Sequence, residues 1–332
     1  FILVDNRDRE NEGDLVIPAS KINAKKINFM AKHGRGLICL ALTQEKVKKL
    51  KLPLMSLINK SRTQTAFTVS IEAKKGISTG ISAYDRAKTI KVAIKNSSGS
   101  RDIVSPGHVF PLVSKNGGVL ERAGHTEASV DISKLAKLNP SAVICEVMNE
   151  DGTMARYNDL VPFSKKHNLK IAKIEDLISY RLKNEKFIKM ISNRKINIKR
   201  FGNYDLKVFK NKLDGAEHYA VTSKNFSYRK SPRVRVISTN IINTIFNFKN
   251  NIFKSTLNYL SKFNNFALII VKSPSHTKNS KENSKILRYY GVGAQIIKEL
   301  KIKDMILVSR SKKRIIALKG YGIKIKKQEI LK

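Results

Sequence analysis

The feature that most constrains the fold is the alternation of strand-like and helix-like segments along the first 182 residues. Short apolar runs of the kind found in buried strands occur at residues 15–18, 36–42, 109–114 and 142–148. The helical segments between them start after residues that favour N-caps, and the expected caps are Asn23, Thr43, Ser82 and Thr126. This order predicts an α/β (α+β) domain in which helices cover a sheet.

A chain of 332 residues exceeds one ordinary domain, so a second domain is expected. We predict a linker over the Lys/Asn/Ile-rich residues 183–199 and a second domain over 200–332, with the first over 1–182. In the second part, strand-like runs are expected at residues 219–222, 234–238, 266–271 and 304–309, a helix at 290–300, and a polar loop at 273–284.

Positive charge is concentrated in the second part of the chain. Residues 1–180 carry 29 basic and 18 acidic residues, whereas residues 181–332 carry 36 and 8, so the second part accounts for +28 of the net +39. Such a charge raises the question of nucleic-acid binding. The basic residues are spread out, no aromatic-basic motif accompanies them, and Lys, Asn and Ile are abundant throughout, as AT-rich codons would give. Codon composition is therefore favoured over a nucleic-acid partner as the explanation of the charge.

Cysteine and apolar content restrict the class of protein further. The two cysteines, Cys39 and Cys145, both stand in apolar strand-like runs, which predicts no disulfide framework, no cysteine-based zinc site and a reducing, cytoplasmic location. No apolar run approaches the ~20 residues of a membrane span. The sequence opens inside a strand-like run, so we expect the natural N-terminus to lie upstream, where a targeting segment would also lie.

An acidic run at residues 5–14 is the most informative stretch. Glu10, Glu12 and Asp14 alternate, so an extended chain would direct all three carboxylates to one side, and Gly13 allows close approach of the backbone. Clusters of oxygen ligands suit Mg²⁺, which takes one or two carboxylates together with waters and substrate oxygens. The alternative is a solvated charged loop.

Three further stretches carry candidate chemistry. His108 stands beside apolar residues, where a structural histidine is the more common interpretation. Arg122, His125 and Thr126 lead into a predicted helix, and a helix start with a nearby arginine binds phosphate, although a plain helix cap would need Thr126 alone. Glu146 ends an apolar strand, and such a carboxylate can act as a base.

The order of these stretches resembles one family, 3,4-dihydroxy-2-butanone 4-phosphate synthase. The shared runs are Asp-Arg-Glu-Asn-Glu-Gly-Asp (8–14), Phe-Thr-Val-Ser-Ile-Glu-Ala (67–73), Gly-Ile-Ser-Ala-Tyr-Asp-Arg (80–86), Pro-Gly-His-Val-Phe-Pro-Leu (106–112), Gly-His-Thr-Glu-Ala (124–128) and Asn-Glu-Asp-Gly-Thr-Met-Ala-Arg (149–156). The resemblance spans residues 1–182 with no motif lost. It implies an α/β sandwich-like subunit that forms a homodimer, with active sites near the dimer interface.

The resemblance also implies roles for matching residues. Glu10 and His125 match the protein ligands of two Mg²⁺ (or Mn²⁺) ions, and His108 and Glu146 match the catalytic positions. The positions that match substrate-binding residues are Arg9, Glu10, Asp14, Arg122, Ala123, Gly124, His125, Thr126 and Glu146, of which the 122–126 segment would hold the phosphate. Further matches to pocket-lining positions are Cys39, Thr79, Asp85 and Glu127. The implied activity is that of a lyase in riboflavin biosynthesis, which converts ribulose 5-phosphate into 3,4-dihydroxy-2-butanone 4-phosphate and formate with no organic cofactor.

The second part resembles GTP cyclohydrolase II only in its framework. Matching runs lie at residues 200–204, 217–221, 234–236, 290–297 and 320–323. That family holds zinc with three cysteines, but no cysteine follows Cys145, and residues 238–244 correspond to the run in which the zinc cysteines begin. Other runs of that family, among them the one that handles GTP, are replaced around residues 273–284, 286–288 and 309–312. We predict no zinc and no cyclohydrolase activity here. A dimer-supporting role, a nucleotide- or RNA-binding module, and decay without a retained role stay open.

Overall fold

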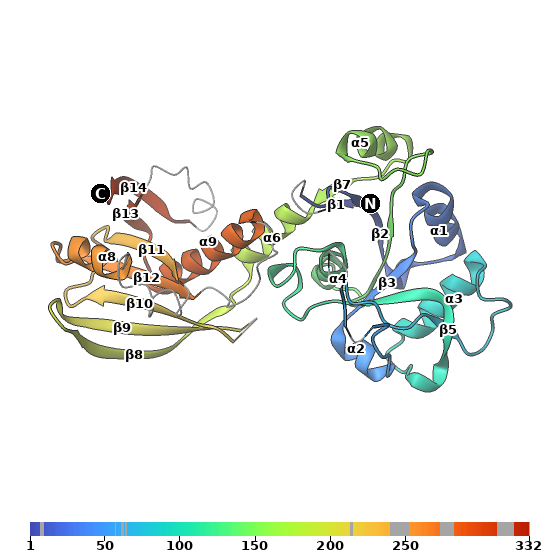
Figure 1. The fold of residues 1–332 in the computed structure, drawn as a ribbon, viewed down its shortest axis with the longest axis horizontal. Helices are drawn as coiled ribbons and strands as arrows, with labels where there is room; N and C mark the ends of the chain where they lie inside the picture. Colours follow the sequence, from blue (N-terminus) through green and yellow to red (C-terminus); the bar gives the residue numbers. More distant parts are fainter. Residues whose placement is uncertain are drawn as a thin grey trace. The chain divides into compact units, whose positions relative to one another are not determined.

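The computed structural model describes residues 1–6, 10–56, 58–60, 63, 65–212, 215–239, 252–272, 282–310 and 322–331. The chain forms two compact units, Phe1–Ile178 and Ser179–Lys332 (Figure 1). Each unit is built around one seven-stranded sheet with helices packed against it, and each is described by itself. The prediction of an α/β (α+β) fold is therefore confirmed.

The sheet of the first unit has the strand order β4-β5-β3-β6-β2-β1-β7. Its strands are β1 (Ile2–Val4), β2 (Gly13–Pro18), β3 (Cys39–Leu42), β4 (Ile71–Ala73), β5 (Ile103–Val113), β6 (Ala142–Glu146) and β7 (Ile171–Lys173). Strand β2 pairs antiparallel with both β1 and β6. Because β1 and β3 are buried at every position, their sequences read as continuous apolar runs rather than as an alternation.

The helices of the first unit each follow a strand in the sequence. They are α1 (Ala24–Phe29), α2 (Gln44–Lys49), α3 (Ala83–Ile94), α4 (His125–Leu135), α5 (Tyr157–Lys166) and α6 (Ile174–Asn184), and a π-helical turn, Met30–Gly34, extends α1. The predicted caps Asn23, Thr43 and Ser82 are confirmed, because each side-chain oxygen accepts a backbone N–H from the first turn. The predicted cap at Thr126 is wrong: the N-cap is Gly124, with extended backbone, so α4 begins two residues earlier than predicted and Thr126 lies in its first turn.

The second unit has the strand order β14-β13-β11-β12-β10-β9-β8. Its elements are β8 (Ile188–Ile198), β9 (Gly202–Asn211), β10 (Glu217–Ser223), β11 (Arg233–Thr239), α8 (Ile252–Leu260), β12 (Phe266–Lys272), α9 (Glu282–Glu299), β13 (Asp304–Ser309) and β14 (Lys324–Ile330). Strands β11 to β14 form a parallel part and β8 to β10 an antiparallel part. The predicted strands at 219–222, 234–238, 266–271 and 304–309 all lie in strands of this sheet.

Two expectations for this region need correction. Residues 183–199, expected as a linker, instead consist mainly of β8, an 11-residue strand that pairs with β9 along its length. The second unit accordingly begins at Ser179, inside α6, and not at residue 200. Of the expected loop at 273–284, residues 273–281 lie outside the described part of the chain, and the remainder belongs to α9.

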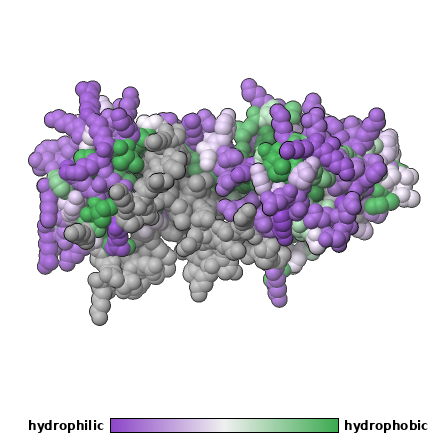
Figure 2. Space-filling view, turned by 90° about the horizontal axis from the view of Figure 1, so that it is seen from above, coloured by the Kyte–Doolittle hydropathy of each residue, from purple (hydrophilic) through white to green (hydrophobic). Residues whose placement is uncertain are grey.

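The surface agrees with the composition. In the view of Figure 2, hydrophilic side chains cover most of the surface of the described residues, and hydrophobic side chains gather in small areas. Among the described residues, no helix has both the length and the apolar character needed to cross a membrane.

Candidate active site

The floor of the candidate site is formed by two neighbouring strands of the first sheet. Asp14 on β2 lies directly opposite Glu146 at the end of β6. One oxygen of Glu146 accepts the backbone N–H of Leu37 at 2.8 Å, and Gly36 packs against the same carboxylate so closely that a Cβ there would lie 2.6 Å from Oε2. The segment that precedes β3 therefore fixes the orientation of Glu146.

Residues 10–12 of the acidic run form a turn whose backbone is held by hydrogen bonds. Both carboxylate oxygens of Asp5 accept backbone N–H groups, from Glu10 at 3.1 Å and from Glu12 at 2.9 Å. Arg156 donates to the backbone oxygens of Glu10 and Asn11 at 2.8 and 2.7 Å. The carboxylate of Asp5 and the guanidinium of Arg156 thus hold the 10–12 turn. Arg9, a predicted substrate-binding residue, lies outside the described residues.

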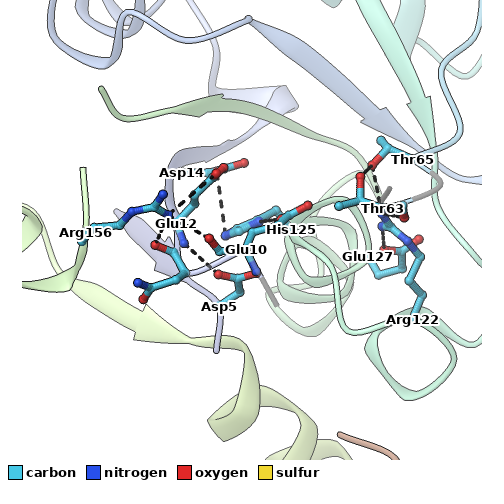
Figure 3. A network of polar contacts seen from close by, with 11 residues as sticks. Asp5, Glu10, Glu12, Asp14, Thr63, Thr65, Arg122, His125, Glu127 and Arg156 are labelled. Carbon is cyan, nitrogen blue, oxygen red and sulfur yellow. Dashed lines mark hydrogen bonds and ion pairs between the residues drawn. The ribbon is translucent and has the colours of Figure 1, made fainter. Parts of the chain in front are cut away.

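His125, the first residue of α4, faces this turn. Its Nδ1 lies 3.5 Å from Oε2 of Glu10, and its Nε2 lies 3.7 Å from Oδ1 of Asp14. Figure 3 shows the carboxylates of Asp5, Glu10 and Asp14 gathered around the imidazole. One donor atom each from Asp5, Glu10 and His125 lie within 4.8 Å of one another, so these three side chains can share one metal ion.

The electrostatics of the cluster favour a bound cation. Burial raises the pKa of Asp14 to about 7; His125 acts in the opposite direction, while Glu146, Glu10 and Glu12 add to the increase. Burial and the neighbouring Glu10 also raise the pKa of Glu12. Carboxylates crowded in this way repel one another, and a divalent cation relieves that repulsion. The oxygen-rich donor set with one imidazole fits Mg²⁺ or Mn²⁺.

The predicted phosphate-binding segment lies at the start of α4. Arg122 is held by Glu127 at 2.6 Å and by the backbone oxygen of Thr63 and the hydroxyl of Thr65 at 3.1 and 3.0 Å (Figure 3). Burial raises the pKa of Glu127, and Arg122 acts in the opposite direction. Gly124 fits beneath the guanidinium, where a Cβ would lie 2.3 Å from Nη1. Arg122 is therefore fixed at a helix start, where anions bind.

The other predicted residues form two groups. Cys39 lies near Asp14 and Glu146, whereas Asp85, Thr79 and His108 lie around the turn at Gly80. Cys39 is buried near Asp14 and Glu146, and burial together with these carboxylates raises the pKa of its thiol, so this group is not a ready nucleophile. Asp85 is buried and accepts hydrogen bonds from Ser78 and from the backbone of Gly80.

His108 and Thr79 are exposed. In the part of the chain that the structure describes, His108 contacts Glu72 rather than the cluster around His125.

Comparison with known proteins places this arrangement in a family. Residues 1–180 match the family described as 3,4-dihydroxy-2-butanone 4-phosphate synthase. The chain belongs to this family. Residues 258–329 match the family described as GTP cyclohydrolase II, so the resemblance of the second unit to that enzyme is also found, over a shorter range than residues 200–332.

Individual relatives share both units. The riboflavin biosynthesis protein RibBA of Aquifex aeolicus is 42% identical, and the alignment covers 98% of this chain and 87% of that protein. The solved structure of RibBX, a two-domain 3,4-dihydroxy-2-butanone 4-phosphate synthase from A. baumannii, is 38% identical with a TM-score of 0.86, and covers 100% of this chain and 95% of that one. Another solved synthase, in complex with two magnesium ions, matches 55% of this chain and 90% of its own at 38% identity and a TM-score of 0.53.

Several residues of the site were not predicted from the sequence, among them Asp5, Arg156 and Glu72. Asp5 and Arg156 both lie in runs that carry the synthase resemblance or adjoin it, but their contacts with the 10–12 turn depend on the folded chain. Glu72 lies in the run at 67–73, and only the pairing of β4 with β5 brings it to His108. Proximity of these residues in the fold, rather than their spacing in the sequence, is the signal that identifies them.

Proposed function

We propose that the first unit converts ribulose 5-phosphate into 3,4-dihydroxy-2-butanone 4-phosphate and formate. The observation that carries the proposal is the opposition of Asp14 and Glu146 on neighbouring strands, with Glu10 and His125 facing them. Family membership supports the same reaction. The five carbons of the sugar phosphate divide between a four-carbon phosphate and formate with no net oxidation, so no organic cofactor or co-substrate is needed.

Glu10 and His125 would hold the metal, as two Mg²⁺ (or Mn²⁺) ions, with Asp5 as an additional oxygen donor and no role for zinc. Support comes from the donor atoms that converge within 4.8 Å and from the relative solved with two magnesium ions. Divalent ions bound there stabilise negative charge on sugar oxygens. The carboxylate of Asp14, buried beside the imidazole, would bind the hydroxyl groups of the sugar.

Proton transfer is assigned to Glu146 and His108. Glu146 has one oxygen bound to the Leu37 N–H, so its other oxygen can take a proton from a sugar carbon or hydroxyl. His108 would exchange protons during the later dehydration step. Arg122 and the residues up to Thr126 would bind the phosphate, since they join a fixed guanidinium to a helix start. Arg9 is assigned to the substrate on resemblance alone.

Formate release from ribulose 5-phosphate in the presence of Mg²⁺ tests the proposal. The full chain should release one formate per substrate, and removal of Mg²⁺ by a chelator should abolish the release. Glu146→Gln should reduce kcat by at least about 10²-fold, as expected when an acid–base group is lost, while the fold is retained. Glu45→Gln, an exposed carboxylate on α2, is the matched control. Near-normal activity of Glu146→Gln would remove Glu146 from the mechanism.

We further propose that the second unit has no GTP cyclohydrolase II activity. No cysteine follows Cys145, so the three-cysteine zinc site of that family cannot form in this unit. Without that zinc, no activated water is available for ring opening. Purified protein given GTP and Zn²⁺ should release no formate above the background of a heat-denatured sample. Zinc-dependent release would contradict this proposal.

A homodimer is the proposed assembly. Several large apolar side chains of the first unit are exposed, among them Met55, Ile58 and Tyr84, with Ile58 at 72%. Apolar side chains mark protein interfaces where they gather into one patch, and the family resemblance itself implies the dimer. Sedimentation at assay concentrations should give twice the mass of the chain, and an active monomer would contradict the proposal.

A further inference from the structure

Helix α4 carries two buried acidic side chains on one face. Glu127 and Asp131 are four residues apart, so their side chains lie one helical turn apart on the same side of the helix. Glu127 is 1% exposed and Asp131 is 3% exposed. Glu127 binds the guanidinium of Arg122 at 2.6 Å, whereas Asp131 faces the backbone of the turn at residues 118–120.

Asp131 fixes this turn by a hydrogen bond and by close packing. Its Oδ2 accepts the backbone N–H of Val119, itself fully buried, at 2.8 Å. Gly118 has a φ of +58°, and a Cβ there would lie 2.2 Å from each carboxylate oxygen of Asp131. Only glycine therefore fits between the turn and the carboxylate.

The same turn carries the backbone of Arg122. The carbonyl oxygen of Gly118 accepts the N–H of Glu121 at 2.9 Å and the N–H of Arg122 at 3.0 Å. The main chain of Arg122 is thus bonded to the residue that packs against Asp131. A displacement of Gly118 is therefore transmitted to Arg122.

We propose that Asp131 is a positioning residue for the phosphate-binding segment. Glu127 fixes the guanidinium of Arg122, and Asp131 fixes the turn to which the main chain of Arg122 is bonded. The two carboxylates thus hold the side chain and the backbone of one arginine. Such support matters because recognition of phosphate by arginine depends on the geometry of its N–H groups. The proposal rests on the phosphate role proposed above for Arg122, and assigns Asp131 no contact with substrate.

Steady-state kinetics of the full chain test whether Asp131 acts through Arg122. Asp131→Ala removes the acceptor and should raise KM for ribulose 5-phosphate about 10-fold, with a smaller change in kcat. Asp131→Asn keeps the volume and one acceptor oxygen, and should keep KM close to the native value. In an Arg122→Ala background, Asp131→Ala should raise KM no further, because the group it positions is absent. Equal increases in both backgrounds would overturn the proposal.

Gly118→Ala disturbs the same contact from the other side, and decides the matter if Asp131→Ala does not fold. Its Cβ would press on both carboxylate oxygens, so KM should again rise. Gly76→Ala is the matched control, since Gly76 has a φ of +75° and a Cβ there meets only the flexible end of Lys88, at 3.3 Å. A folded Gly118→Ala with the KM of Gly76→Ala would contradict the proposal.

Hydrogen exchange of the full chain separates this inference from the proposed function. The backbone N–H groups of Val119 and Arg122 should exchange at least about 10-fold faster in Asp131→Ala, whereas those inside α4 keep their protection. Unchanged exchange at Val119 and Arg122 overturns the inference whatever the kinetics. A native KM in Arg122→Ala, together with faster exchange in Asp131→Ala, instead removes the phosphate role of Arg122 and leaves Asp131 as the support of the turn.

Discussion

Gly36 has no room for a side chain, because it packs against the backbone and the carboxylate of Glu146. A Cβ at this position would lie 2.5 Å from the Glu146 carbonyl oxygen and 2.6 Å from its Oε2. We predict that Gly36→Ala lowers kcat for formate release about 100-fold, since displacement of a reacting group by about 1 Å has effects of this size. The free energy of unfolding should fall by about 1–3 kcal/mol, measured in urea.

Gly99 provides the matched control for that prediction. It is also a non-helical glycine of the first unit, but a Cβ there would meet only the backbone oxygen of Lys49 at an ordinary 3.9 Å. Gly99→Ala should therefore leave both kcat and stability close to those of the unchanged chain. If Gly36→Ala behaves in the same way, the close packing around Glu146 does not control its position.

At the level of residues, the local sequence pattern predicted the carboxylates that face His125 but not the contacts made by Glu72 and Arg156. The alternation of Glu10 and Asp14 indicated a shared side, and both do face His125. The contact of Glu72 with His108 joins residues 36 positions apart, and that of Arg156 with Glu10 joins residues 146 apart. Such contacts depend on which strands pair and with what register, and no local spacing encodes them.

At the level of secondary-structure elements, the helix N-caps are the feature that the sequence predicted best. The side chain of Asn23 accepts the Lys26 N–H at 3.0 Å at the start of α1. We predict that Asn23→Ala lowers the free energy of unfolding by about 1 kcal/mol, measured by urea denaturation, because that N–H loses its acceptor. Asn23→Asp retains an acceptor and is the control. Equal destabilisation by the two substitutions would show that the cap contributes little.

A strand that lacks a regular alternation of buried and exposed residues could not be predicted from the sequence. Strand β8 has one fully buried position, Ile188, and its remaining residues are exposed or half-buried, so no two-residue alternation marks it. Its Lys, Asn and Ser content is typical of a linker, and pairing with β9 alone makes it a strand. The cap at Thr126 failed for a related reason, because glycine at 124 adopts the extended cap conformation without a side-chain signal.

For the whole molecule, the division of the chain predicts where activity resides. All the strands of the first sheet lie before residue 174, and every described residue of the candidate site lies within Phe1–Ile178. The boundary falls inside α6, where Ile174 and Ile178 are buried, whereas Leu182 contacts Gly291 of the second unit. A chain that ends at Tyr180 therefore contains the whole first unit and omits Leu182, which packs in the second unit.

We predict that the chain 1–180 keeps the kcat of the full chain for formate release from ribulose 5-phosphate with Mg²⁺. The reason is that the described groups assigned to metal, substrate and proton transfer all lie in the first unit, on strands β2, β5 and β6, in the segment between β1 and β2, and in the segment that leads into α4 and the first turn of that helix. Thermal unfolding and sedimentation of the same sample give the control, because they establish that the shortened chain is folded and whether it still associates. A folded chain 1–180 with the association state of the full chain but little activity would contradict the prediction. A folded monomer with reduced activity would instead assign the second unit a role in dimer formation. Such a role needs no zinc site, so the absence of cysteines after Cys145 does not exclude it.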